Sequence, residues 1–162
     1  MKQIILSLSI LFLLTGNLFS AGSSSSDDNA KTKSNYEKAV THIEAAKKHE
    51  KKGKLEKANK RYAKAQGLLI KSNNKKPNNA DTLNYLGFTT RKLGDFENGE
   101  KYYLQGLAID PNHKGINEYL GELYVNTDRI SKAKERLKVL ENCNCEEFKE
   151  LSDAIKQGGS KY

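Results

Sequence analysis

The chain has 162 residues, of which 30% are charged, with 28 Lys or Arg against 20 Asp or Glu and no Trp. This length suffices for one ordinary domain. Because Pro is scarce and β-branched residues do not alternate between frequent turns, the composition favours a helical domain and argues against a β-sandwich.

The first 22 residues have the layout of a secretory signal peptide. Lys2 gives a positive start, an apolar run follows over Ile4–Leu14, and small residues lie at Ser20–Gly22. An uncleaved membrane anchor is the alternative, but a bilayer span needs about 20 apolar residues. We therefore predict a cleaved signal over 1–22, an exported, periplasmic protein, and a disordered polar spacer over 23–34.

Positive charge is concentrated in the next part of the chain. Lys31–Lys76 carries fifteen Lys or Arg against four Glu, whereas Pro77–Tyr162 carries twelve basic against fourteen acidic residues. Such a surplus can attract an acidic protein, anionic lipid heads or nucleic acid, although a solvated helix face is the simpler interpretation. We expect no nucleic acid partner and retain contact of Lys47–Lys76 with an anionic surface as an alternative function.

From Ser34 onward, apolar residues at helical spacing predict seven helices, in three antiparallel pairs and one more. Gly53 divides the first pair, and Pro77 ends it. The second pair runs from Asn79 to Pro111. The third follows and ends at the NCNC sequence before the last helix.

Five residues or pairs of residues are expected to begin helices. Ser34 with Glu37 has the spacing of a capping box, and Asn144 with Glu147 resembles one. Asn79, Asp95 and Asp128 are expected to cap the helices that follow them.

The second and third pairs repeat at an offset of 34 residues, since NYLG at Asn84–Gly87 recurs as EYLG at Glu118–Gly121. A helix–turn–helix unit of this period resembles the tetratricopeptide repeat, or TPR. The positions that match it are Leu83, Leu86, Gly87, Gly99, Tyr103, Gly106 and Pro111, and then Leu120, Gly121, Tyr124, Ala133 and Leu137. The first pair matches less well, because His42 lies where a large apolar residue is expected and Pro77 comes seven residues late. Its second helix or its exit should therefore be extended.

This resemblance implies an all-α fold, a right-handed superhelical α-solenoid of about three TPR helix pairs and a C-terminal capping helix. The TPR domain would span 35–157, with repeats at about 39–79, 80–113 and 114–143, a capping helix at about 145–157 and a flexible tail at 158–162. The signal peptide, the Ser-rich lead and the CEEFKELSDAI sequence of the tail also resemble small exported bacterial TPR proteins.

By the same resemblance, the first helix of each pair lines a concave groove. The implied partner-binding residues are Asp81, Asn84, Phe88, Arg91, Lys92, Glu118, Glu122, Val125 and Asn126, with Gly115 and, less securely, Val40, Ile43, Lys47, Glu50 and Lys51. Phe88 beside Arg91, expected to face solvent, is the best candidate anchor. The alternative is that Phe88 packs against the neighbouring pair.

The sequence holds no P-loop, H-E-x-x-H or G-x-S-x-G motif, and His42, His49 and His113 are scattered. We therefore expect no enzyme activity, cofactor or metal site. The only two Cys residues, Cys143 and Cys145, could form a local disulfide, remain free thiols, or serve a redox or metal role.

These observations predict a non-enzymatic protein–protein interaction module of the bacterial envelope. It would hold a peptide or helix of another protein, whose identity the sequence does not give, in the concave TPR groove. Binding of a polyanion or membrane surface through the basic first pair is the alternative. The oligomeric state cannot be read from the sequence.

Overall fold

A computed structural model of the chain describes residues 33–158. The predicted signal peptide, the predicted spacer up to residue 32 and the predicted tail beyond residue 158 lie outside this range. The helices are α1 (Asn35–Glu50), α2 (Leu55–Lys75), α3 (Ala80–Lys92), α4 (Phe96–Ile109), α5 (Lys114–Asn126), α6 (Ile130–Leu140) and α7 (Glu146–Lys156).

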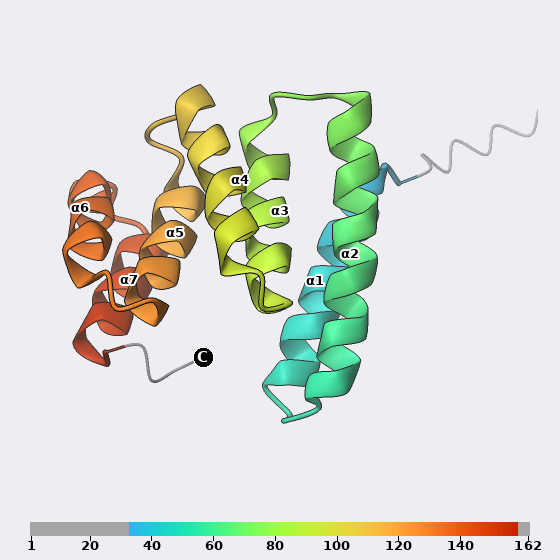
Figure 1. Cartoon of the computed structure of the whole chain (residues 1–162), viewed down its shortest axis with the longest axis horizontal. Coiled ribbons are helices and arrows are strands. Elements are labelled where there is room, and N and C mark those ends of the chain that lie inside the picture. The colour runs from blue at the N-terminus through green and yellow to red at the C-terminus, as the bar shows by residue number, and fades with distance from the viewer. Residues whose placement is uncertain (1–32, 159–162) are drawn as a thin grey trace, which may run out of the picture. The chain divides into compact units, whose positions relative to one another are not determined.

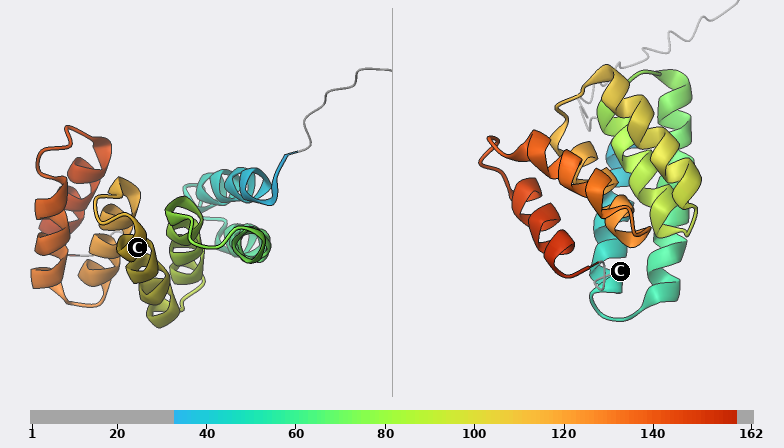
Figure 2. Two further views of the ribbon diagram at one scale, coloured as in Figure 1. Left: turned by 90° about the horizontal axis from the view of Figure 1, so that it is seen from above. Right: turned by 60° about the vertical axis from the view of Figure 1, so that its left-hand side comes forward.

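The helices follow one another as antiparallel pairs, α1–α2, α3–α4 and α5–α6, and α7 packs against both α5 and α6 (Figures 1 and 2). The first helices of the second and third pairs, α3 and α5, also contact one another. The predicted all-α fold of three helix pairs and a capping helix is confirmed for the described residues.

Side chains cap three of the helices as expected. Ser34 forms the complete capping box with Glu37, Asn79 accepts a hydrogen bond from the Thr82 N–H, and Asp95 accepts one from the Asn98 N–H. These bonds satisfy amide groups that have no partner within the helix.

Two other capping predictions are wrong. Asp128 and Asn144 have φ angles of 56° and 45°, in the left-handed region, and the helices start one residue later than expected, with Arg129 and Cys145 at the N-cap positions. Asp and Asn tolerate this region better than other residues with side chains. Each therefore shapes the turn that precedes a helix and does not cap it.

The predicted extension of the first pair lies in α2, which has 21 residues, compared with 14 in α4 and 11 in α6. Its buried positions are Ala58, Tyr62, Ala65 and Leu69, so the buried stripe ends at Leu69, before the end of the helix. Pro77 follows the end of α2, and Asn79 begins the next helix.

The repeated glycines allow close packing of helices. A Cβ atom on Gly87 would collide with the ring of Tyr103, and one on Gly121 would collide with the side chain of Leu151. Leu86 and Leu120, beside them, are each 1% exposed. The shared tetrapeptide therefore marks the positions at which α3 meets α4 and α5 meets α7.

Among the helices between residues 33 and 158, none combines the length and the apolar character that a membrane span needs.

Candidate functional site

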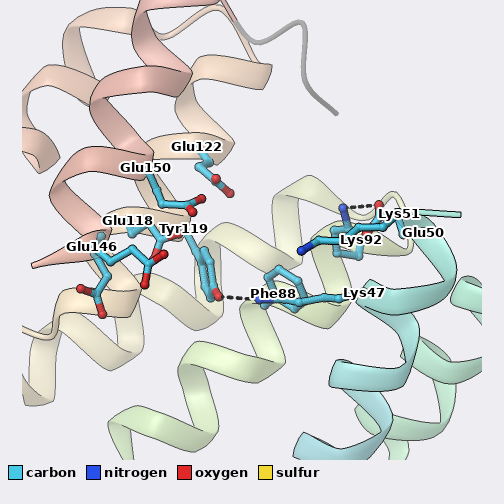
Figure 3. Close-up of a pocket in the computed structure, with 11 residues that line it drawn as sticks. Lys47, Glu50, Lys51, Phe88, Lys92, Glu118, Tyr119, Glu122, Glu146 and Glu150 are labelled. Carbon is cyan, nitrogen blue, oxygen red and sulfur yellow. Dashed lines mark hydrogen bonds and ion pairs between the residues drawn. The ribbon is translucent and has the colours of Figure 1, made fainter.

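One cavity lies between the helix pairs and is lined by α1, α3, α5 and α7. Its volume is about 670 Å³. We call it the central cavity (Figure 3). Its lining residues are Lys47, Glu50, Lys51, Phe88, Lys92, Glu118, Tyr119, Glu122, Glu146, Glu147 and Glu150.

Two aromatic rings form the apolar part of this lining. The ring centroids of Phe88 and Tyr119 are 4.8 Å apart, and those of Tyr62 and Phe88 are 5.7 Å apart. The Lys47 ammonium lies 4.8 Å from the centre of the Phe88 ring and donates a hydrogen bond of 3.1 Å to the Tyr119 hydroxyl. Cations at this distance from a ring are attracted by its negative face.

The α1 and α3 side of the cavity is mainly basic. Lys47 and Lys51 belong to the end of α1, and Lys92 ends α3. Lys92 forms an ion pair with Glu50, which also accepts a hydrogen bond of 2.8 Å from the Tyr62 hydroxyl. We call Lys47, Lys51 and Lys92 the basic wall.

The α5 and α7 side is acidic. Carboxylate oxygens of Glu118, Glu122 and Glu150 lie within 4.8 Å of one another, and Figure 3 shows them on the opposite side of the cavity from Lys51 and Lys92. Glu146 and Glu147 also line this side. We call Glu118, Glu122 and Glu150 the acidic triad.

The members of the triad have different surroundings. Glu122 accepts a bond of 2.8 Å from the Arg91 guanidinium, and both side chains are 2% exposed. Glu118 is 8% exposed and has neither a hydrogen bond nor an ion pair with any residue between 33 and 158. Burial, together with the charges of Glu122 and Glu150, raises the pKa of Glu118 to about 8.

Among the described residues, the triad is the only cluster of His, Cys, Asp or Glu with the proximity of metal ligands. Three carboxylates that each offer one oxygen supply only three of the six to eight oxygens that Ca²⁺ takes. The Arg91 guanidinium on Glu122 also adds a positive charge beside the position that a cation would occupy. Because this charge opposes a divalent ion more strongly than a single positive charge, the site suits a singly charged cationic group better than a divalent metal ion.

The structure brings together part of the predicted groove. Phe88, Lys92, Glu118 and Glu122 line the central cavity with the first-repeat residues Lys47, Glu50 and Lys51. The other predicted residues lie elsewhere. The Asp81 carboxylate lies 3.1 Å from His113 Nε2, at hydrogen-bonding distance, and Asn84 lies against Gly115. Arg91, Val125 and Asn126 line another cavity, near the α3–α4 turn.

The expectation that Phe88 faces solvent is wrong, because Phe88 is only 4% exposed. The rings of Tyr62 and Tyr119 cover it from α2 and α5, and Lys47 covers it from α1. Arg91 and Val125, at 3% and 2%, are buried as well. These side chains pack between the helices, and Phe88 still lines part of the cavity.

Sequence reasoning missed Tyr119, Glu146, Glu147 and Glu150. Tyr119 directly follows an expected groove position, and α7 was expected only to cap the repeats. The run of acidic residues over Glu146–Glu150 was the available signal, because residues four apart share one face of a helix.

Cys143 and Cys145 are joined by a disulfide in the turn between α6 and α7, with their Cα atoms 5.2 Å apart. Neither residue lines the central cavity.

No protein-family model matches the chain, and no curated protein matches it. Similar solved structures include the Arabidopsis OM64 TPR domain, which is 17% identical, with 76% of this chain and 98% of that chain covered and a TM-score of 0.48. The Yersinia enterocolitica type III secretion translocator chaperone SycD is 20% identical, with coverages of 75% and 88% and a TM-score of 0.48. The first TPR domain of human RPAP3 is 20% identical, with coverages of 77% and 98% and a TM-score of 0.46.

These similarities concern the fold alone. The described residues have the TPR fold, since α3 and α5 begin at Ala80 and Lys114, 34 residues apart, and each starts a packed helix pair.

Proposed function

We propose that this protein is a non-enzymatic protein–protein interaction module that holds a partner peptide or helix in the central cavity. The central cavity carries this proposal. Each of the three pairs contributes its first helix to the lining, so a bound segment would contact the whole stack. Its volume of about 670 Å³ lies within the usual range for ligand sites.

The lining supports a segment of mixed character. Aromatic rings offer apolar contact, and charged walls of opposite sign fix the orientation of what lies between them. Similar structures that hold peptides include the second TPR of Spaghetti (RPAP3), bound to an HSP90 peptide, and SycD, in complex with a peptide of YopD. Those complexes describe those proteins, and the proposal rests on the cavity of this chain.

Photo-crosslinking in cells tests the proposal. A photoreactive residue replaces Lys51, which is exposed and lines the cavity, or Lys134, which is exposed on α6 and serves as the control. We expect a distinct crosslinked protein from position 51 only. A synthetic peptide of the crosslinked segment should then bind the purified protein saturably and lose affinity when Lys51→Glu and Glu150→Lys are combined. The same products from both positions would contradict the proposal.

The proposed setting is the bacterial envelope, with export through residues 1–22 to the periplasm. The layout of the N-terminal sequence supports this setting. Cell fractionation and N-terminal sequencing test it. We expect a periplasmic protein that starts near residue 23, and a mature chain that starts at Met1 would contradict export by a cleaved signal.

Binding of an anionic surface is the second candidate function. Its support is the exposure of the basic residues of the first pair, among them Lys48, Lys52, Lys57, Lys64 and Lys71. Such contacts are screened over about 8 Å at physiological ionic strength. Binding to vesicles that contain anionic lipid should therefore weaken steeply with salt, and binding that is absent or insensitive to salt would exclude this function.

A further inference from the structure

The acidic triad indicates which kind of side chain the bound segment carries. Its three carboxylates come from two helices, α5 and α7, which are adjacent in the fold but separated by α6 in the chain. Like charges at such distances repel one another, so their convergence has an energetic cost, which falls mainly on the buried Glu118 and Glu122 and less on the exposed Glu150. An added positive group would remove that cost.

Only part of this negative charge is balanced within the described residues. Arg91 pairs with Glu122, but Glu118 has no such partner although its side chain is more than nine-tenths buried. In Figure 3 its carboxylate lies beside that of Glu150, where both border the cavity. The Glu118 carboxylate is reached from the cavity, and a ligand that supplies N–H donors there would replace water and stabilise its charged form.

We propose that the acidic triad receives a Lys or Arg side chain of the bound segment. The inference rests on the proposed function, since it assumes that the central cavity holds a segment of another protein. A guanidinium or ammonium group brings several N–H donors to Glu118 and Glu150 at once. The Tyr119 ring, on the same helix as Glu118, offers a face for the aliphatic stem.

The opposite wall strengthens this assignment. Lys47, Lys51 and Lys92 repel a basic side chain from the α1 and α3 side, so the charges favour one direction of entry. A basic residue would therefore point towards α5 and α7. The volume of about 670 Å³ leaves room for neighbouring residues of the segment, which a single metal ion would not need.

The pH dependence of binding supplies a further test of whether Glu118 contacts the basic side chain. Charged groups on three helices act on Glu118: Glu122 on α5, Glu147 and Glu150 on α7, and Lys47 on α1. Burial raises the pKa of Tyr85 on α3 and of Tyr119, and the negative charge of Glu118 adds to both shifts. Because burial and these carboxylates raise the pKa of Glu118, the side chain loses its proton only in mildly alkaline solution when no cation is bound. The affinity for a basic side chain should therefore rise between pH 6 and pH 9.

The test uses heptapeptide libraries that share randomised flanking positions and differ only in the central residue, which is Arg, Lys, Glu or citrulline, the neutral analogue of Arg. Each library is passed over the immobilised protein, and the retained fraction is measured at several pH values. The variants are Glu118→Gln and Glu150→Gln, which keep the side-chain shape. Glu135→Gln, on the exposed surface of α6, is the matched control.

We expect the wild type and the control to retain the Arg and Lys libraries about tenfold better than the citrulline library, with a preference that grows with pH. Both triad variants should lower the preference below twofold, and Glu118→Gln should also remove its pH dependence. Thermal melts of each variant show whether it is folded.

Other outcomes separate the two proposals. If no library is retained, the proposed function fails together with the inference. If libraries are retained equally whatever the central residue, the cavity binds peptides and only the inference fails. The inference also fails if the Arg and citrulline libraries are retained equally and the triad instead binds Ca²⁺ or Mn²⁺. It fails likewise if they are retained equally and the triad instead contacts a second copy of the chain.

Discussion

Helices α3 and α5 hold equivalent places in consecutive repeats, yet they present different surfaces to the cavity. Leu86 and Leu120 are buried alike, and Gly87 and Gly121 each make room for a large side chain of another helix. One position further along, α3 has Phe88 and α5 has Glu122. The packing residues are therefore repeated and the cavity residues are not.

This difference gives the central cavity its two walls. Lys92 at the end of α3 belongs to the basic wall, whereas Glu118 and Glu122 of α5 belong to the acidic triad. The two repeats thus share their packing residues. They differ in the residues that line the cavity, and this difference produces the charge asymmetry on which the proposed specificity depends. Changes on the two helices should therefore have separable effects on stability and on binding.

The buried ion pair between α3 and α5 should show the largest effect. Arg91→Met leaves the Glu122 carboxylate buried without its guanidinium partner, so the free energy of unfolding should fall by about 3–5 kcal/mol. Adding Glu122→Leu removes that carboxylate and should restore most of the loss. Urea denaturation of the two variants measures both effects, and a double variant as unstable as the single one would contradict this assignment.

The two glycines should differ in their tolerance of a side chain. Gly87→Ala forces a methyl group against the buried Tyr103 ring, and overpacking of this kind costs about 1–3 kcal/mol. Gly121→Ala should cost less, because it meets the end of the flexible Leu151 side chain.

Gly67 of α2 is the matched control for these substitutions, since a Cβ atom there would meet nothing within 4 Å. Gly67→Ala should stabilise the protein by about 0.5–1 kcal/mol through the higher helix propensity of Ala. Thermal unfolding of the three variants gives the order of their stabilities. The same change in stability for Gly87→Ala and Gly67→Ala would show that close packing at Gly87 is not required.

The effect of Glu118→Gln on stability should depend on pH. The pKa of Glu118 is raised from 4.5 to about 8 in the folded protein, so between these values the folded state binds more protons than the unfolded state. Stability should therefore fall as pH rises from about 4.5 to 8, and Gln, which stays neutral, should avoid this loss.

The variant should thus be more stable than the wild type, with the larger gain above pH 8 and the smaller gain near pH 5. Urea denaturation at pH 5, 7 and 9 measures the difference. A gain that does not change with pH would contradict the raised pKa.

Local sequence signals predicted the scaffold well. The apolar stripes, the 34-residue offset and the caps at Ser34, Asn79 and Asp95 identified the helices and their pairing, because each depends on residues close together in the chain. Asp128 and Asn144 show the limit of such signals. The same residue types favour both caps and left-handed turns, and tertiary packing decides between them.

The cavity was predicted only in part because its chemistry depends on contacts between distant segments. The burial of Phe88 requires Tyr62 and Tyr119 from other helices, and the pairing of Arg91 with Glu122 spans 31 residues. The contribution of Glu150 appears only once α7 packs against α5. Repeat positions alone indicate the side of a helix that faces the groove, but they do not indicate which side chains fill it.

Backbone amide NMR shifts test the central claim most directly. The Arg-centred heptapeptide that is retained best is added to the labelled protein, and the shift of each residue is mapped on the structure. We predict the largest changes along the cavity-lining parts of α1, α3, α5 and α7, with little change at exposed residues of α4 and α6. Changes concentrated on α4 and α6, or none at a saturating peptide concentration, would contradict binding in the central cavity.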